Sequence, residues 1–111
     1  MVQYYRQLDS AFAALADPTR RGILERLGRG DASISDLAAR FDMTLTGMKK
    51  HVRTLEDARL VTTEKVGRVR QVRLGPHRLE QEAAWIEKYR EMLESRYDRL
   101  GEFLERTKEA P

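Results

Sequence analysis

Two short helical patterns follow one another between Ser33 and Ala58 with only a few residues between them, and this spacing constrains the fold more than any other feature. Ser33 and Asp36 form a pair that starts a helix by bonding each other's backbone amides, and Thr44 is placed to cap the second helix. The first helix is barely two turns long, so it cannot be stable alone in water and must pack against its neighbours. The segment therefore predicts a helix-turn-helix unit.

The second of these helices, expected from Leu45 to about Ala58, has an apolar side and a basic side. Three apolar residues recur at i, i+4 and i+7 and should be buried: Met48, Val52 and Leu55. The other side carries Thr46, Lys49, Lys50 and Arg53. In a helix-turn-helix, the second helix enters the major groove of DNA by its N-terminal end, where lysines reach phosphates or guanine edges. The pattern therefore predicts a DNA-reading helix.

Residues at the start of this helix complete the predicted DNA contacts. Thr44 lies beside free backbone amides that favour anions, so it can bond a phosphate. Thr46 can reach a base edge, and Leu45 can contact a thymine methyl group. Gly47 would let the backbone approach DNA closely, although a merely tolerated glycine is an equally good interpretation.

After Leu60 the hydrophobic period changes from 3.6 residues to 2. Residues 61–66 and 69–74 carry β-branched side chains on both sides of Gly67, which predicts the two strands of a hairpin. Its tip carries Lys65, Arg68 and Arg70. Cations at a hairpin tip are common for solubility, but here they follow a cationic helix. We therefore interpret the hairpin as a wing that contacts the DNA backbone or minor groove.

Two more helices are expected before this unit. The first covers about residues 3–16 and has one apolar stripe, formed by Tyr5, Leu8, Phe12 and Leu15. The next begins at Asp17, whose side chain can accept hydrogen bonds from the free amides of a helix start. Pro18 suits the first helical position, and Gly28 and Gly30 end the helix.

One long helix is expected from about Pro76 to Lys108. Two apolar series recur in it every seven residues: Leu79, Ile86, Leu93 and Leu100, and Ala83, Tyr97 and Leu104, the second interrupted by Arg90. Such a helix is about 45 Å long, more than a small domain needs. We expect its stripe to pack partly on the first helix and partly on a second copy of the chain, although one chain could cover it alone. The expected dimer interface comprises Tyr5, Leu8, Phe12, Trp85, Ile86, Tyr89, Leu93, Tyr97 and Leu100.

The positive charge is confined to the middle of the chain. The net charge is only +3, but residues 44–74 hold eight Lys and Arg against three Asp and Glu, a net charge of +5. Residues 1–43 are neutral and residues 75–111 have a net charge of −2. A concentrated basic stripe is typical of a polyanion-binding surface, although a solvated face is the plainer alternative.

Other functional classes find little support. The chain has no cysteine, two histidines and no glycine-rich phosphate loop, so we expect no enzyme, no bound metal and no cofactor. We interpret His51 as a partly buried residue that hydrogen-bonds within the fold or to a phosphate. No segment approaches the apolar length of a signal peptide or a membrane span, so we expect a cytoplasmic protein without membrane partners.

Together, the stretches DPTRRGILERL, ISDLAARFDMTLTGMKKHVRTLEDARLV and GRVRQVRL resemble the winged helix-turn-helix repressors of the ArsR/SmtB type, from Leu8 to Leu104. The expected fold is one mainly α domain over residues 1–111, with five helices, a two-stranded wing, and residues 1–16 and 76–108 as dimerisation helices. The resemblance implies a homodimeric repressor that joins its copies through the first and last helices and reads a palindromic operator upstream of its own operon.

The chain departs from that family in its sensing residues. Founding members bind metals through cysteines on the short helix or Asp, His and Glu clusters on the last helix, whereas this chain has Ser33, Ile34 and Ser35, and only His77 with Glu80. Many relatives have serine where this chain has Lys49. The stretch TLTGMKKHVRTLEDARLV resembles a subgroup of the family whose inducer is unknown. The alternative function is a winged-helix protein-interaction module without DNA binding, and the charge distribution argues against it.

Overall fold

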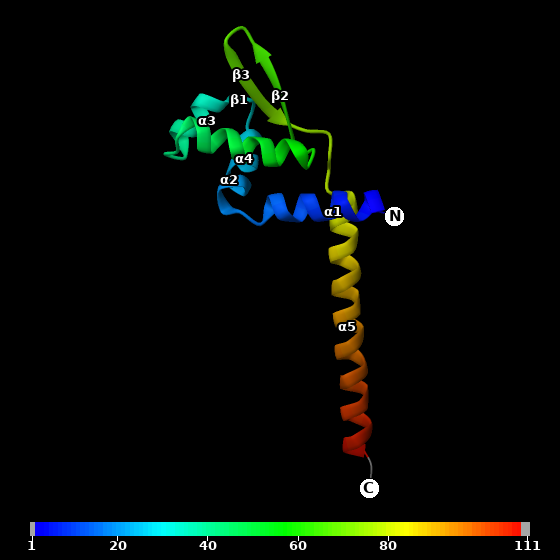
Figure 1. Cartoon of the computed structure of the whole chain (residues 1–111). Coiled ribbons are helices and arrows are strands. Elements are labelled where there is room, and N and C mark those ends of the chain that lie inside the picture. Colours follow the sequence, from blue (N-terminus) through cyan, green and yellow to red (C-terminus); the bar gives the residue numbers. More distant parts are fainter. Residues whose placement is uncertain (1, 110–111) are drawn as a thin grey trace. The chain divides into compact units, whose positions relative to one another are not determined.

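The computed structural model describes the backbone of residues 2–109 and the side-chain environment of residues 6–107. The elements follow in the order α1 (Val2–Leu15), α2 (Pro18–Leu27), β1 (Ala32–Ser33), α3 (Ile34–Arg40), α4 (Leu45–Asp57), β2 (Val61–Val66), β3 (Val69–Leu74) and α5 (Glu80–Glu109) (Figure 1). The chain divides into two compact units, Met1–Leu79 and Glu80–Pro111, and each is described by itself.

The helix starts are set by the capping residues that the sequence predicts. Asp17 Oδ2 accepts a hydrogen bond from the Arg20 backbone N–H at 3.0 Å. Ser33 Oγ accepts one from Asp36 N–H at 3.0 Å, and Thr44 Oγ1 accepts one from Gly47 N–H at 3.1 Å. Each bond satisfies one amide that the first helical turn leaves without a partner. The predicted caps of α2, α3 and α4 are therefore confirmed.

A tight turn joins α3 to α4. Asp42 adopts a left-handed conformation with φ of 53°, which a short polar side chain tolerates better than most residues. Met43 N–H donates to the Ala38 carbonyl at 2.9 Å and closes the turn. This geometry carries the chain from the end of α3 directly to the cap of α4, as a helix-turn-helix requires.

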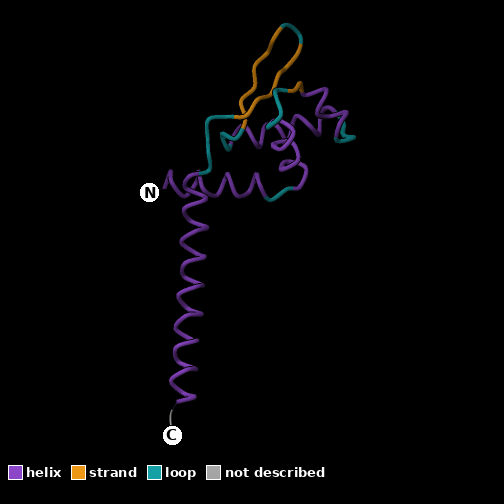
Figure 2. The backbone as a smooth tube through the Cα atoms, turned by 180° about the vertical axis from the view of Figure 1, so that it is seen from behind, coloured by secondary structure: helices purple, strands orange, loops and turns teal. Residues whose placement is uncertain are grey.

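The sheet has one more strand than the sequence predicts. The hairpin of β2 and β3 has the predicted bounds, and β1 adds to it in the order β1-β3-β2, all antiparallel. In Figure 2 the hairpin is the long orange loop that projects from the helices. In β1, Ala32 pairs with Val72 and Ser33 pairs with Gln71. A strand of two residues is too short to produce an alternating pattern, so no period in the sequence indicates it.

The core of the first unit lies between its helices and the base of the hairpin. Met48, Val52 and Leu55 of α4 are buried, as the sequence predicts. They join a buried cluster that draws on α1, α2, α3 and the sheet, including Ala14, Ile23, Leu37, Val61 and Val72. Because α4 is anchored by these three residues, its basic side faces outward.

The last helix begins later than predicted, at Glu80 and not near Pro76. The preceding segment is tied to the end of α4, because Gly75 N–H donates to the Leu60 carbonyl at 2.8 Å and His77 N–H donates to the Arg59 carbonyl at 3.3 Å. Leu79 has a φ of 62°, so it is not helical, and it packs against the core of the first unit instead of starting the seam of α5.

The second unit is the single helix α5 of 30 residues. Within residues 2–109, no helix combines the length and the apolar character needed to cross a lipid bilayer.

Candidate nucleic-acid interface

A groove of about 820 Å³ lies between α4 and the hairpin, within the first unit. Its walls come from the start of α3, one side of α4 and one face of β2 and β3. Five cations line it: Lys49, Arg53, Lys65, Arg68 and Arg70. All five are among the residues that the sequence predicts to bind DNA, and Leu45, a sixth, also lines the groove.

The alternation of side chains in the hairpin explains why its cations point into this groove. Thr63 pairs with Val72 and Lys65 pairs with Arg70, so these four side chains share one face of the hairpin. Val72 is fully buried against the helices, which fixes this face toward α4. The opposite face carries Arg73, whose guanidinium lies 2.8 Å from a Glu64 oxygen and 3.8 Å from an Asp31 oxygen.

The groove-lining cations differ in whether hydrogen bonds within the chain restrict their side chains. Arg70 Nη1 donates to Thr63 Oγ1 at 3.1 Å, and that hydroxyl group donates to Glu56 Oε2 at 2.8 Å. The side chains of Lys49, Arg53, Lys65 and Arg68 make no hydrogen bond or ion pair with the part of the chain that the structure describes. Their charges therefore remain available for an external anion.

The other predicted contacts of α4 lie outside the groove lining. Thr44, Thr46 and Lys50 are exposed near the start of the helix. A Cβ at Gly47 would lie 3.1 Å from Thr44 Oγ1 and 3.3 Å from Met43 Cε. Contacts within the chain therefore explain why glycine suits position 47, because a side chain there would crowd the cap of α4. A residue that the sequence analysis did not include is Glu56, which lines the groove together with Asp57.

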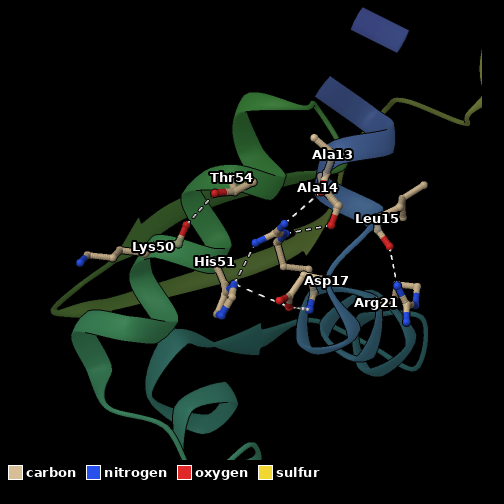
Figure 3. Close-up of polar contacts among 9 residues, drawn as sticks. Ala13, Ala14, Leu15, Asp17, Arg21, Lys50, His51 and Thr54 are labelled. Atoms are coloured by element: carbon tan, nitrogen blue, oxygen red, sulfur yellow. Dashed lines mark hydrogen bonds and ion pairs between the residues drawn. The ribbon is translucent and has the colours of Figure 1, made fainter. Parts of the chain in front are cut away.

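A polar cluster of Asp17, Arg20 and His51 joins α1, α2 and α4. Arg20 donates to the carbonyls of Ala14 at 2.8 Å and Ala13 at 3.0 Å, and its Nη1 lies 3.2 Å from His51 Nδ1 (Figure 3). Arginine has only donors, so Nδ1 of His51 accepts in this contact when the imidazole is neutral. The expected hydrogen bonding of His51 within the fold is confirmed, but its partners are 31 and 34 residues away and have no local signal.

The pKa of Asp17 is lowered from its ordinary value. The largest cause is the hydrogen bond from the Arg20 backbone N–H, which favours the charged carboxylate. Desolvation raises the pKa, and the charges of His51 and Arg20 lower it further. The cap of α2 is therefore a carboxylate that its surroundings keep ionised.

Apolar side chains remain exposed along α5 in the single chain. Of the predicted dimer residues, the exposed ones are Trp85, Ile86, Tyr89, Tyr97 and Leu100. Trp85 and Tyr89 stack with their ring centroids 5.7 Å apart. Three further exposed side chains lie outside the expected interface set, although Leu104 belongs to the predicted apolar stripe: Met92, Phe103 and Leu104. Exposed apolar surface of this extent is typical of a protein-binding face.

The remaining predicted dimer residues are less exposed. Leu93 and Phe12 are half-buried. Leu8 is buried within the chain, so its side chain does not offer a surface to a second copy. The Tyr5 side chain lies outside the described residues. Among residues with described side chains, no three His, Asp or Glu side chains lie close enough together to hold a metal ion, and the sequence has no cysteine.

Comparisons with known proteins agree with this geometry. Residues 15–64 match a family described as a helix-turn-helix domain. The chain is similar to the HTH-type transcriptional regulator Rv2034 of Mycobacterium tuberculosis, with 39% identity over 72 residues that cover 65% of this chain and 67% of the relative. It is also similar to the transcriptional repressor SdpR of Bacillus subtilis, with 32% identity over 60 residues that cover 54% and 67%.

Among solved structures, the chain is similar to a crystal structure of the ArsR family transcriptional regulator RHA00566. The two share 45% sequence identity with a TM-score of 0.76, over 86% of this chain and 98% of the other. These relatives are transcriptional regulators and not enzymes.

Proposed function

The chain belongs to the ArsR family of transcriptional regulators, and from that premise we propose that it is a homodimeric repressor that binds a two-fold symmetric operator in double-stranded DNA. The observation that carries this proposal is the groove between α4 and the hairpin, because five cations from two separate elements line it. The repressor name of one relative supports the direction of regulation.

The proposed contacts divide between the two elements. The start of α4 enters the major groove, where Lys49, Lys50 and Thr46 reach phosphates and base edges. Thr44, Leu45, Gly47 and Arg53 complete this surface. Lys65, Arg68 and Arg70 of the wing contact the neighbouring phosphates or the minor groove.

A second copy of the chain supplies the second reading helix. The exposed apolar side chains of α5 support a dimer formed through the last helix, with α1 contributing as the family resemblance implies. Two reading helices would then enter successive major grooves about 34–36 Å apart. The operator would therefore be palindromic, and a site upstream of its own operon would let the protein limit its own synthesis. A DNA partner is consistent with the cytoplasmic location that the sequence analysis expects.

Selection from a random pool of DNA duplexes tests this function. The full chain should enrich a common sequence with two inverted half-sites, and a reporter driven by its own upstream region should be repressed only when that sequence is intact. If no sequence is enriched above unrelated duplex at about 0.15 M salt, the proposal is wrong, because a specific regulator binds its site about 10³-fold or more tighter than other DNA.

A further inference from the structure

We propose that Glu56 is a positioning residue of the DNA-binding groove, which acts through the hydroxyl group of Thr63 to present the Arg70 guanidinium to DNA in one orientation. This inference rests on the proposed DNA-binding function. It adds to that function a residue of negative charge, in a surface that is otherwise defined by its cations.

Two hydrogen bonds in series join three elements. Thr63 Oγ1 of β2 donates to Glu56 Oε2 of α4 at 2.8 Å, and Arg70 Nη1 of β3 donates to the same Thr63 Oγ1 at 3.1 Å. A hydroxyl group can do both, because it carries one donor and two acceptor lone pairs. The reading helix and both strands of the wing are thereby linked at one point of the groove wall.

This link restricts Arg70 more than its neighbours. Lys65 lies directly opposite Arg70 in the hairpin, but the side chains of Lys65 and Arg68 have no hydrogen-bond partner among the described residues. Only one of the five N–H donors of the Arg70 guanidinium is bonded to Thr63, so the others remain for a phosphate or a base edge. A side chain that is already oriented loses less conformational entropy when DNA binds.

The charge of Glu56 has a second consequence. Glu56 and Asp57 line the same groove as the five cations, so that part of the groove repels phosphate. The two carboxylates differ in one respect that serves as a control, since Asp57 makes no hydrogen bond to the wing. Both limit where the DNA backbone can run, but only Glu56 also holds the wing.

A double-mutant cycle on Thr63 and Arg70 tests the positioning role. The probes are a duplex that the wild type selects from a random pool and a scrambled duplex of equal length and composition. Thr63→Val keeps the shape of the side chain and suits a strand, but it removes the hydroxyl group. We expect it to weaken binding to the selected duplex about 5- to 10-fold, as for the net loss of one typical hydrogen bond, and Thr63→Ser to restore most of that loss.

The coupling between the two residues is the decisive readout. Arg70→Ala should weaken binding strongly in the wild-type background and at least about threefold less in the Thr63→Val background, because Arg70 is then no longer oriented. A purely structural role of Thr63 would instead lower the unfolding temperature and leave the cost of Arg70→Ala unchanged.

A matched pair of carboxylate variants tests the role of Glu56. Glu56→Ala and Asp57→Ala each remove one negative charge facing the groove, so both should bind the scrambled duplex more tightly. Only Glu56→Ala should also reduce the ratio of selected to scrambled affinity, because only it releases the wing.

The outcomes distinguish failure of the positioning role of Glu56 from failure of the proposed DNA-binding function. If Thr63→Val binds the selected duplex as tightly as Thr63→Ser does, if Arg70→Ala costs the same in both backgrounds, or if the two carboxylate variants behave alike, the positioning role is overturned and DNA binding stands. If the wild type selects no duplex from the pool, both the function and this inference are overturned.

Discussion

Neighbouring residues of α4 have distinct surroundings, and Lys49 and Lys50 illustrate this at the scale of single side chains. Lys49 lines the groove, whereas Lys50 is exposed outside it. The side-chain ammonium group of neither lysine makes a hydrogen bond or ion pair with the described residues. Two cations on adjacent sides of one helix can neutralise two different phosphates, which a salt titration can count.

Replacing Lys49 and Lys50 together by alanine is expected to weaken DNA binding and to reduce the slope of log K against log salt by about two units, because each lost phosphate contact releases about one counterion fewer. The measurement is a series of equilibrium titrations between low and moderate salt. The matched control is Lys88→Ala with Arg106→Ala, which removes the same charge from exposed positions of α5. An unchanged slope in the α4 variant would remove these lysines from the interface.

Gly75 lies against the backbone of the segment that joins α4 to β2. A Cβ there would lie 2.6 Å from the Arg59 carbonyl oxygen, which is backbone and cannot move aside. Gly75→Ala is therefore expected to lower the free energy of unfolding by about 1–3 kcal/mol, the usual cost of overpacking, as measured by denaturant titration.

Gly101 provides the opposite case for the same substitution. It lies within α5, and a Cβ there would meet nothing within 4 Å. Gly101→Ala should be neutral or stabilise the helix by up to about 1 kcal/mol. Equal effects of the two substitutions would show that the close approach at Gly75 does not matter.

At the scale of elements, the start of α2 depends on an ionised carboxylate. The Arg20 N–H and the nearby charges keep the pKa of Asp17 below its value in an unfolded chain. The folded state therefore gains stability from Asp17 above the unfolded pKa, and this contribution is lost as the pH falls through the lowered folded pKa.

Asp17→Asn is accordingly expected to reduce part of the acid sensitivity of the fold. Asparagine also caps helices, so stability near neutral pH should fall only modestly, while the decline between about pH 5 and pH 2 should become shallower. Thermal unfolding over this pH range measures both effects. Parallel curves for the wild type and the variant would contradict the assignment of Asp17 as a titrating cap.

The elements also show what the sequence can predict. The caps at Asp17, Ser33 and Thr44 depend on bonds across three residues, and the hairpin has an alternating pattern, so both follow from local signals. The beginning of α5 does not, because the carbonyls of Arg59 and Leu60 hold the preceding segment out of the helix. The heptad pattern includes Leu79 and therefore predicts a helix that begins before Glu80.

In the candidate site, too, features that depend on neighbouring residues can be predicted from the sequence, whereas contacts between distant residues cannot. The cations follow from charge and period, and the structure brings Lys49, Arg53 and Arg68 to one groove. The bond from Thr63 to Glu56 and the contact of Arg20 with His51 join residues on different elements. Such partners depend on how the elements pack, which no pattern within one element specifies.

In the whole molecule, binding to a two-fold symmetric operator requires two copies of the chain. Ile86→Glu with Leu100→Glu places charges in the exposed apolar stripe of α5 and is expected to yield monomers by light scattering. DNA affinity should then fall by about 10² or more, since the two half-sites are no longer bound by one molecule.

The control for this prediction is Ala84→Glu with Ser95→Glu. By the 3.6-residue period, these exposed positions lie on the side of α5 opposite Ile86. This variant should remain dimeric and bind DNA like the wild type. A dimeric Ile86→Glu, Leu100→Glu variant would mean that the stripe of α5 is not the interface.

Hydroxyl-radical footprinting of the wild-type protein, on a duplex that it selects from a random pool, tests whether a dimer binds a symmetric operator through the groove and wing. We expect two equal protected regions related by two-fold symmetry, with centres one helical turn of DNA or a small multiple of it apart. Within each half, the contact of the wing should appear as protection flanking that of the reading helix. A single asymmetric footprint, or protection that persists when the five groove-lining cations are replaced by alanine, would contradict the account.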